Sequence, residues 1–125
     1  MEHLTNFGFI LHLVIETTAS VNFFLRPSAT LPMPQPYSHG IIRQYALLLL
    51  ATNIIVAVIL SRAMHDALSG QIAAAVAMYH GGPFVRAVSR IRRGEVGDEL
   101  GGAWLHAFSH LLCAACLAAS SLLLW

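Results

Sequence analysis

The sequence contains no lysine and few charged residues of any kind. All seven basic residues are arginine, and charged residues make up 10% of the 125 positions, against about 25% in a typical soluble protein. The absence of lysine excludes Schiff-base chemistry. A net charge of +1 excludes the basic surface that nucleic-acid binding requires. With 57% hydrophobic residues, the chain is expected to form a single integral membrane domain, residues 1–125.

Motifs of several enzyme classes are also missing. The sequence has no glycine-rich phosphate loop and no nicotinamide-binding fingerprint, and nothing in it resembles an activated serine or cysteine nucleophile. The two cysteines, Cys113 and Cys116, lie among leucine and alanine, which favours buried, inert thiols over a metal or redox pair. No cleavable signal sequence is expected, because His12 and Glu16 interrupt the first apolar stretch.

Four apolar stretches predict membrane-spanning helices, since about 20 such residues cross a bilayer. The predicted spans are residues 4–25, 41–60, 63–80 and 103–125. They indicate an all-α, four-helix transmembrane bundle with up-down topology. Four prolines between Arg26 and Tyr37 predict an extended loop. Over Phe84–Arg93 apolar residues alternate with arginine, which predicts a short interfacial amphipathic helix; continuation of the third span is the alternative.

The distribution of arginine predicts the orientation of the spans. The two longer connections hold five arginines and the short connection holds only Arg62, so the longer ones are expected on the cytoplasmic side. Asp66 is expected to cap the third helix. Ser69, Ala73 and Ala77 recur every four residues, which predicts close helix packing. A unit this small also makes a homo-oligomer plausible.

Ionisable side chains lie inside the predicted spans, although a charged group there costs on the order of 2.5–3.5 kcal/mol. One face of the first span carries a mostly polar stripe with Glu16 near mid-membrane. The residues of this stripe are Thr5, Phe9, His12, Glu16 and Ser20. On the second span, Arg43 lies near the cytoplasmic end and Asn53 near the middle. Glu16 also has a structural interpretation, as a neutral carboxyl group that hydrogen-bonds Asn53 or His12.

Three imidazoles are expected in the cytoplasmic half of the bundle. Tyr79 and His80 end the third span, and His106 and His110 share one face near the start of the fourth. Because burial favours the neutral carboxyl group and imidazole titrates near neutrality, Glu16 and these histidines resemble a general acid–base set.

A metal centre is the main alternative for these residues. The spacing His106-x-x-x-His110, with His80 and a carboxylate, is compatible with zinc or iron. Membrane di-iron oxygenases, however, need about eight histidines in repeated clusters, and at most four or five can converge in this chain. We therefore expect no metal and no other cofactor.

Four short motifs point to a known group of proteins. They are Glu16 in a first span ending Phe-Phe-Leu-Arg-Pro, Arg43-Gln-Tyr-Ala, Tyr79-His80-x-x-Pro83-x-x-Arg86-Ala, and Gly101-Gly-x-x-x-His106-x-x-x-His110. With these motifs the sequence resembles the small four-span membrane proteins encoded beside fungal polyketide and terpenoid biosynthetic genes. Some of these are described as membrane epoxide hydrolases or cyclases.

The resemblance implies acid-assisted opening of an epoxide in a lipophilic intermediate that enters from the bilayer. Glu16 would be the acid or base, with His80, His106 and His110 as its proton partners. Arg43 and Asn53 would orient Glu16 or the attacking water, and His12 and Tyr79 would contact substrate. We expect a multi-pass protein of the endoplasmic reticulum. The alternatives are a membrane oxygenase of an aromatic polyketide and a non-enzymatic accessory subunit that binds a lipophilic ligand.

Overall fold

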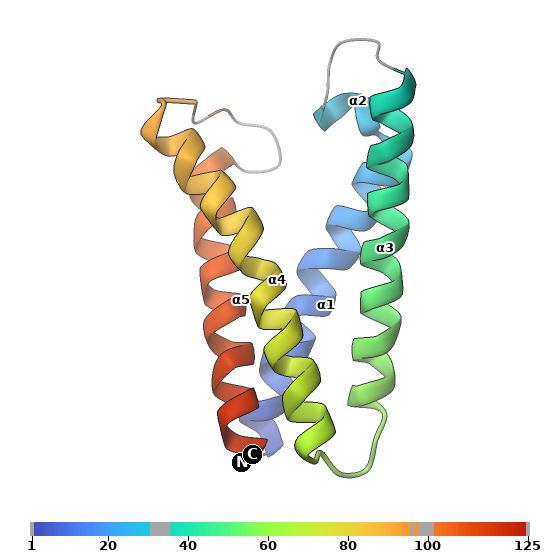
Figure 1. Cartoon of the computed structure of the whole chain (residues 1–125), viewed down its shortest axis with the longest axis vertical. Helices are drawn as coiled ribbons and strands as arrows, with labels where there is room; N and C mark the ends of the chain where they lie inside the picture. Colours follow the sequence, from blue (N-terminus) through green and yellow to red (C-terminus); the bar gives the residue numbers. More distant parts are fainter. Residues whose placement is uncertain (1, 31–35, 96, 98–101, 125) are drawn as a thin grey trace. The chain divides into compact units, whose positions relative to one another are not determined.

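The computed structural model describes residues 2–30, 36–95, 97 and 102–124, and every regular element among them is a helix (Figure 1). The helices are α1 Glu2–Leu25, α2 Pro27–Thr30, α3 Pro36–Leu60, α4 Ala67–Arg92 and α5 Gly102–Leu124. The predicted all-α class is therefore confirmed. The chain forms two compact units. The first contains α1 up to Leu11 with α4 and α5, and the second contains α1 from His12 with α2 and α3.

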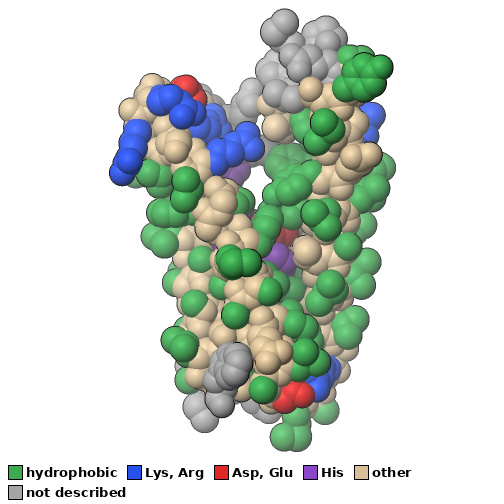
Figure 2. Space-filling model, viewed as in Figure 1, with side chains coloured by type: hydrophobic (Ala, Val, Ile, Leu, Met, Phe, Trp, Pro, Cys, Tyr) green, Lys and Arg blue, Asp and Glu red, His purple; other side chains and the backbone are tan. Residues whose placement is uncertain are grey.

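Among the described residues, three helices are long and apolar enough to cross a membrane: Thr5–Leu25 within α1, and the whole of α3 and of α5. They correspond to the first, second and fourth predicted spans. α4 is not among them, because glycines and the polar Gln71, Tyr79 and His80 lower its mean hydropathy. Large apolar side chains are exposed on the three apolar helices, such as Val14, Leu48 and Leu111, and much of the surface in Figure 2 is hydrophobic.

α4 runs from Ala67 to Arg92 and passes through Pro83. The separate helix predicted over Phe84–Arg93 is therefore wrong, because residues 84–92 continue the third predicted helix, as in the alternative. Pro83 removes one backbone hydrogen bond, which a helix tolerates when packing holds it in place. His80 and Ala87 are buried on either side of Pro83, and α4 packs extensively on α5, so this support is present (Figure 1).

The proline-rich connection is also more helical than predicted. Pro27 begins the short helix α2, and Pro36 begins α3, five residues before the predicted start of the second span. Proline suits the first position of a helix, because its backbone needs no hydrogen-bond donor there and its φ angle is already helical. The predicted extended loop is therefore wrong at Pro27–Thr30 and at Pro36–Tyr37, and residues 31–35 lie outside the described part.

Asp66 begins α4 as predicted. Its side chain accepts a hydrogen bond from the backbone N–H of Ser69 at 3.1 Å, and the Ser69 hydroxyl accepts one from the Asp66 backbone at 3.4 Å, which completes a capping box. Arg62 donates two hydrogen bonds to the same carboxylate, at 2.9 and 2.6 Å. The Arg62 guanidinium and the Ser69 N–H hold the pKa of Asp66 well below its usual range.

Asp66→Ala is expected to lower the thermal unfolding midpoint in detergent micelles by on the order of a few degrees, because the start of α4 loses its cap. Asp66→Asn retains a capping oxygen and should lose less. The pKa of Asp66 is lower in the folded protein than in the unfolded chain, so its ionised carboxylate stabilises the folded state. This stabilisation is complete above the unfolded carboxyl pKa of about 3.9 and declines only as the pH falls below that value. Equal midpoints for wild type and Asp66→Ala at pH 7 would contradict this assignment.

The first unit contains a very close helix contact. A Cβ atom at Gly8 of α1 would lie 3.1 Å from backbone atoms of Cys116 and Leu117 in α5. Nearby, the Ser120 hydroxyl donates to the carbonyl of Thr5 at 3.2 Å. Glycine at position 8 therefore lets the backbones of α1 and α5 approach closely, at a place that the predicted repeat of Ser69, Ala73 and Ala77 does not include.

Gly8→Leu is expected to destabilise the protein by about 1–3 kcal/mol, because the new side chain would force α1 and α5 apart. Gly40→Leu is the matched control, since a Cβ atom at Gly40 meets nothing within 4 Å and leucine favours a helix more than glycine does. Chemical unfolding in mixed micelles measures both. A Gly8→Leu variant as stable as Gly40→Leu would show that the close contact is absent.

Candidate functional site

Two buried histidines of the first unit form a hydrogen-bonded pair. His80 on α4 is fully buried, His110 on α5 is 7% exposed, and their Nδ1 atoms lie 2.8 Å apart. The ring centroids are 5.1 Å apart. Small residues of both helices, including the fully buried Ala73 and Ala103, allow α4 and α5 to approach closely. The structure thus brings together two of the predicted site residues.

His106 and Tyr79 extend this pair. His106 lies one turn before His110 on α5, and the two rings stack with their centroids 6.3 Å apart and their planes at 21°. The predicted shared face of these two histidines is confirmed. The edge of the Tyr79 ring contacts His80, with centroids 5.2 Å apart. Arg90 and Arg86 act electrostatically on His106, and Figure 2 shows arginine side chains gathered at that end of α4.

The sulfur of Cys113 lies within 4.8 Å of a ring nitrogen of His80. Cys113 is buried and Cys116 is half-buried, and neither forms a disulfide. Imidazole and thiolate are donors that zinc accepts, so His80 and Cys113 are two neighbouring residues of this unit with suitable metal-ligating chemistry.

Glu16 lies in the second unit, on the buried face of α1. It is 1% exposed, and His12, one turn before it, is fully buried. All five residues of the predicted stripe are buried, which confirms the helical face that the spacing predicted. One turn after Glu16, the Ser20 hydroxyl donates to the carbonyl of Ala46 on α3 at 2.7 Å.

Asn53 and Arg43 of α3 both contact α1. The amide nitrogen of Asn53 donates to the hydroxyl of Thr17 at 3.1 Å, and its buried Oδ1 accepts no hydrogen bond from the described residues. The exposed Arg43 donates from Nε to the carbonyl of Phe24 at 3.2 Å, which satisfies a carbonyl at the end of α1. Its predicted role in orienting Glu16 gains no support from this bond.

Sequence reasoning missed two polar contacts. Thr17 accepts the hydrogen bond of Asn53 but lies outside the polar stripe of α1. In the sequence, only its position beside Glu16 indicated that it could be part of the site. His65, to which sequence reasoning assigned no role, contacts Oδ1 of Asn6 through Nε2 at 2.5 Å. Nothing in the sequence spacing links Asn6 to a histidine 59 residues away.

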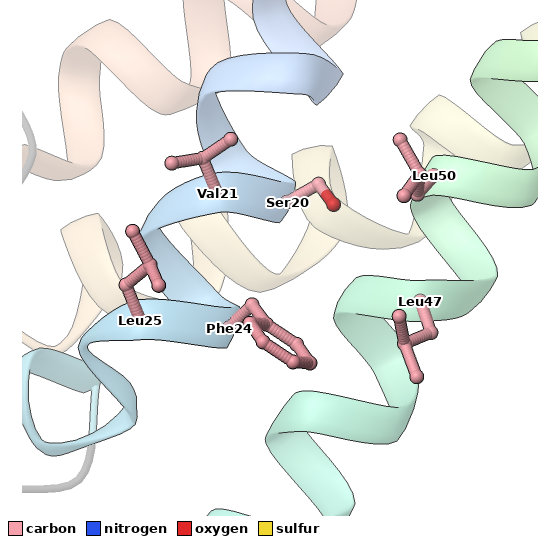
Figure 3. A pocket seen from close by; sticks show the side chains of 6 residues that line it. All are labelled: Ser20, Val21, Phe24, Leu25, Leu47 and Leu50. Carbon is pink, nitrogen blue, oxygen red and sulfur yellow. The ribbon is translucent and has the colours of Figure 1, made fainter.

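A small apolar groove lies between α1 and α3 in the second unit (Figure 3). It has a volume of about 250 Å³. Its walls are formed by Ser20, Val21, Phe24, Leu25, Leu47 and Leu50. Ligand sites usually measure about 300–1,000 Å³, so the groove is smaller than a typical ligand site. It begins one helical turn beyond Glu16.

No protein-family model, curated protein or solved structure matches this chain.

Proposed function

We propose that the protein is a multi-pass membrane enzyme of the endoplasmic reticulum that opens or cyclises an epoxide of a lipophilic polyketide or terpenoid intermediate by acid–base catalysis. The proposal includes a four-span, up-down bundle in which α4 is the third span. The observation that carries it is the hydrogen-bonded pair of His80 and His110, with His106 stacked on it.

Epoxide opening needs two proton movements. A proton must reach the departing oxygen, and another must leave the water or hydroxyl group that attacks the ring carbon. Imidazole performs either step near neutral pH, because it has both a donor and an acceptor nitrogen. We assign Glu16 as the acid or base and the three imidazoles as its proton partners, as the motif resemblance implies. The burial of Glu16 and His80 supports this assignment, because isolated structural polar groups are costly in such surroundings.

The surroundings of Glu16 in the second unit favour a lipophilic substrate. The α1–α3 groove is lined by aromatic and aliphatic side chains, and the Ser20 hydroxyl at its edge already donates to Ala46. An isoprenoid or polyene segment fits such a surface through apolar contact alone. The exposed apolar side chains of α1, α3 and α5 would let such a substrate enter from the lipid.

Orientation supplies a separate test of the proposal. Arginines cluster in the last two turns of α4, and Arg26 lies between α1 and α2, so both regions are assigned to the cytoplasmic side. Cysteines introduced at Ser28 and Gly97, in a background with both native cysteines changed to alanine, should react with an impermeant maleimide from that side only. Labelling of the two positions from opposite sides would contradict the up-down arrangement.

Product analysis tests the reaction itself. The chain is expressed with and without the biosynthetic enzymes encoded beside it, and the products are compared by mass spectrometry. Hydrolysis adds one water to an epoxide-bearing precursor, and cyclisation gives an isomer of the same mass; either result supports the proposal. Addition of an oxygen atom would instead indicate the oxygenase alternative. Binding of the precursor without any conversion would indicate the accessory-subunit alternative.

A further inference from the structure

The two rings of the His80–His110 pair meet through equivalent atoms, since both contribute Nδ1. A neutral imidazole has one protonated and one bare nitrogen. In a hydrogen bond between two Nδ1 atoms, one nitrogen donates and the other accepts, so the two neutral rings must be opposite tautomers. The ring that donates has a bare, basic Nε2. The ring that accepts has a protonated Nε2 that can be given up as an acid.

We infer that the His80–His110 pair is a proton relay that carries a proton from one ring to the other without becoming charged. One N–H bond forms at the bare Nε2, the shared proton moves from one Nδ1 to the other, and one N–H bond breaks at the second Nε2. One proton enters and one leaves, so the pair stays neutral and its tautomers are exchanged. The exchanged pair can next carry a proton only in the opposite direction. Before another transfer in the first direction, the second Nε2 must take a proton from water and the first Nε2 must give one to water, which restores the starting tautomers.

Burial explains why a neutral relay suits this position. His80 is fully buried and His110 is 7% exposed, so a lasting imidazolium on either ring would be costly. Two charged rings are excluded by the geometry, because both Nδ1 atoms would then carry protons that point at each other across 2.8 Å. Within the described part of the chain, His106 is half-buried and contacts His110 by ring stacking, which imposes no such tautomer constraint.

The role of this relay in catalysis rests on the proposed function. Epoxide opening consumes no net proton, but after each turnover the acid lacks a proton and the base holds one extra. A relay that accepts a proton at one Nε2 and releases one at the other returns the proton from base to acid. His80 and His110 would therefore return this proton once per turnover, and exchange with water at their two Nε2 atoms would restore the starting tautomers before the next one.

Nitrogen NMR of the full chain, with isotope-labelled histidine and in lipid nanodiscs, tests the tautomers without any substrate. The expected result is one ring protonated at Nδ1 and bare at Nε2, the other the reverse, and a hydrogen-bonded proton between the two Nδ1 atoms. His106 is the internal reference for an imidazole outside the pair. Identical tautomers for His80 and His110, two charged rings, or a metal bound by both Nδ1 atoms would overturn the inference.

Two variants then separate the hydrogen bond from the relay. Asparagine at position 110 keeps a hydrogen-bonding atom near the place of Nδ1 but has no Nε2, whereas alanine removes both. His110→Asn is expected to preserve a single tautomer of His80 and to lose about 10²–10⁴-fold in turnover. Full turnover by His110→Asn would overturn the relay while leaving the proposed function intact. Opposite tautomers in a wild-type protein without turnover would overturn the proposed function instead.

Discussion

Glu16→Gln is expected to lower kcat for a lipophilic epoxide by about 10²–10⁴-fold, which amounts to loss of measurable turnover. Glutamine has nearly the size of glutamate and still forms hydrogen bonds, but it neither donates nor accepts the catalytic proton. Because Glu16 is 1% exposed, an isosteric replacement also avoids opening a cavity in the buried face of α1. Product formation in proteoliposomes measures the effect.

The matched control for this variant is Glu95→Gln. Glu95 is exposed and its carboxylate pairs with Arg93 at 2.8 Å, so its loss should leave turnover unchanged. Thermal unfolding of both variants should resemble that of the wild type, which separates a chemical defect from a folding defect. Undiminished activity of Glu16→Gln would remove Glu16 from the mechanism.

His110→Ala and His106→Ala are each expected to lower kcat by about 10²–10⁴-fold. Their effects on stability should differ. His110→Ala leaves the buried Nδ1 of His80 without its imidazole partner, which costs about 1–3 kcal/mol. His106 is half-buried and contacts His110 by ring stacking, so its loss should cost less. A chemical role therefore predicts two equally inactive variants of unequal stability.

His39→Ala is the control for these imidazole variants, since His39 lies in the first turn of α3 and has no assigned role in the proposed reaction. If His106→Ala retains wild-type turnover and His110→Ala loses it only in proportion to unfolding, the imidazoles do not transfer protons. Metal analysis of the same purified proteins addresses the alternative chemistry. A stoichiometric zinc or iron that His110→Ala releases would replace the acid–base account with a metal centre.

Helical periodicity predicted much of the fold. The stripe of α1 was predicted from a repeat of three or four residues, and all five of its members are buried. Asp66 was predicted as a cap because an acidic residue suits the start of a helix, and it caps α4. These predictions succeeded because both depend on local geometry, which the sequence specifies directly.

The errors arise where tertiary packing or position within a helix decides the outcome. A proline usually ends a helix, but α4 continues through Pro83, and Ala87 beyond it is still buried in a helix that packs extensively on α5. The prolines at positions 27 and 36 begin helices, where proline is favourable, rather than interrupting them. Residue type alone does not distinguish a proline at a helix start from one that breaks a helix.

The candidate site was predicted only in part, because some of its contacts depend on tertiary packing. The shared face of His106 and His110 follows from their spacing of four residues, whereas the contact of His110 with His80 depends on how α4 rotates against α5. The partners of Asn53 and Arg43 likewise depend on the register between α1 and α3. Whether Glu16 and the imidazoles serve one reaction stays a prediction.

A double-mutant cycle on kcat, with Glu16→Gln and His110→Ala alone and combined, tests most directly whether the carboxyl group and the imidazoles belong to one proton-transfer system. Groups that act as a unit are strongly non-additive, because removal of either already disables the shared step. We therefore predict that the combined variant is about as slow as the slower single variant. Fully multiplicative losses in the combined variant would contradict the account, since the two side chains would then affect turnover independently.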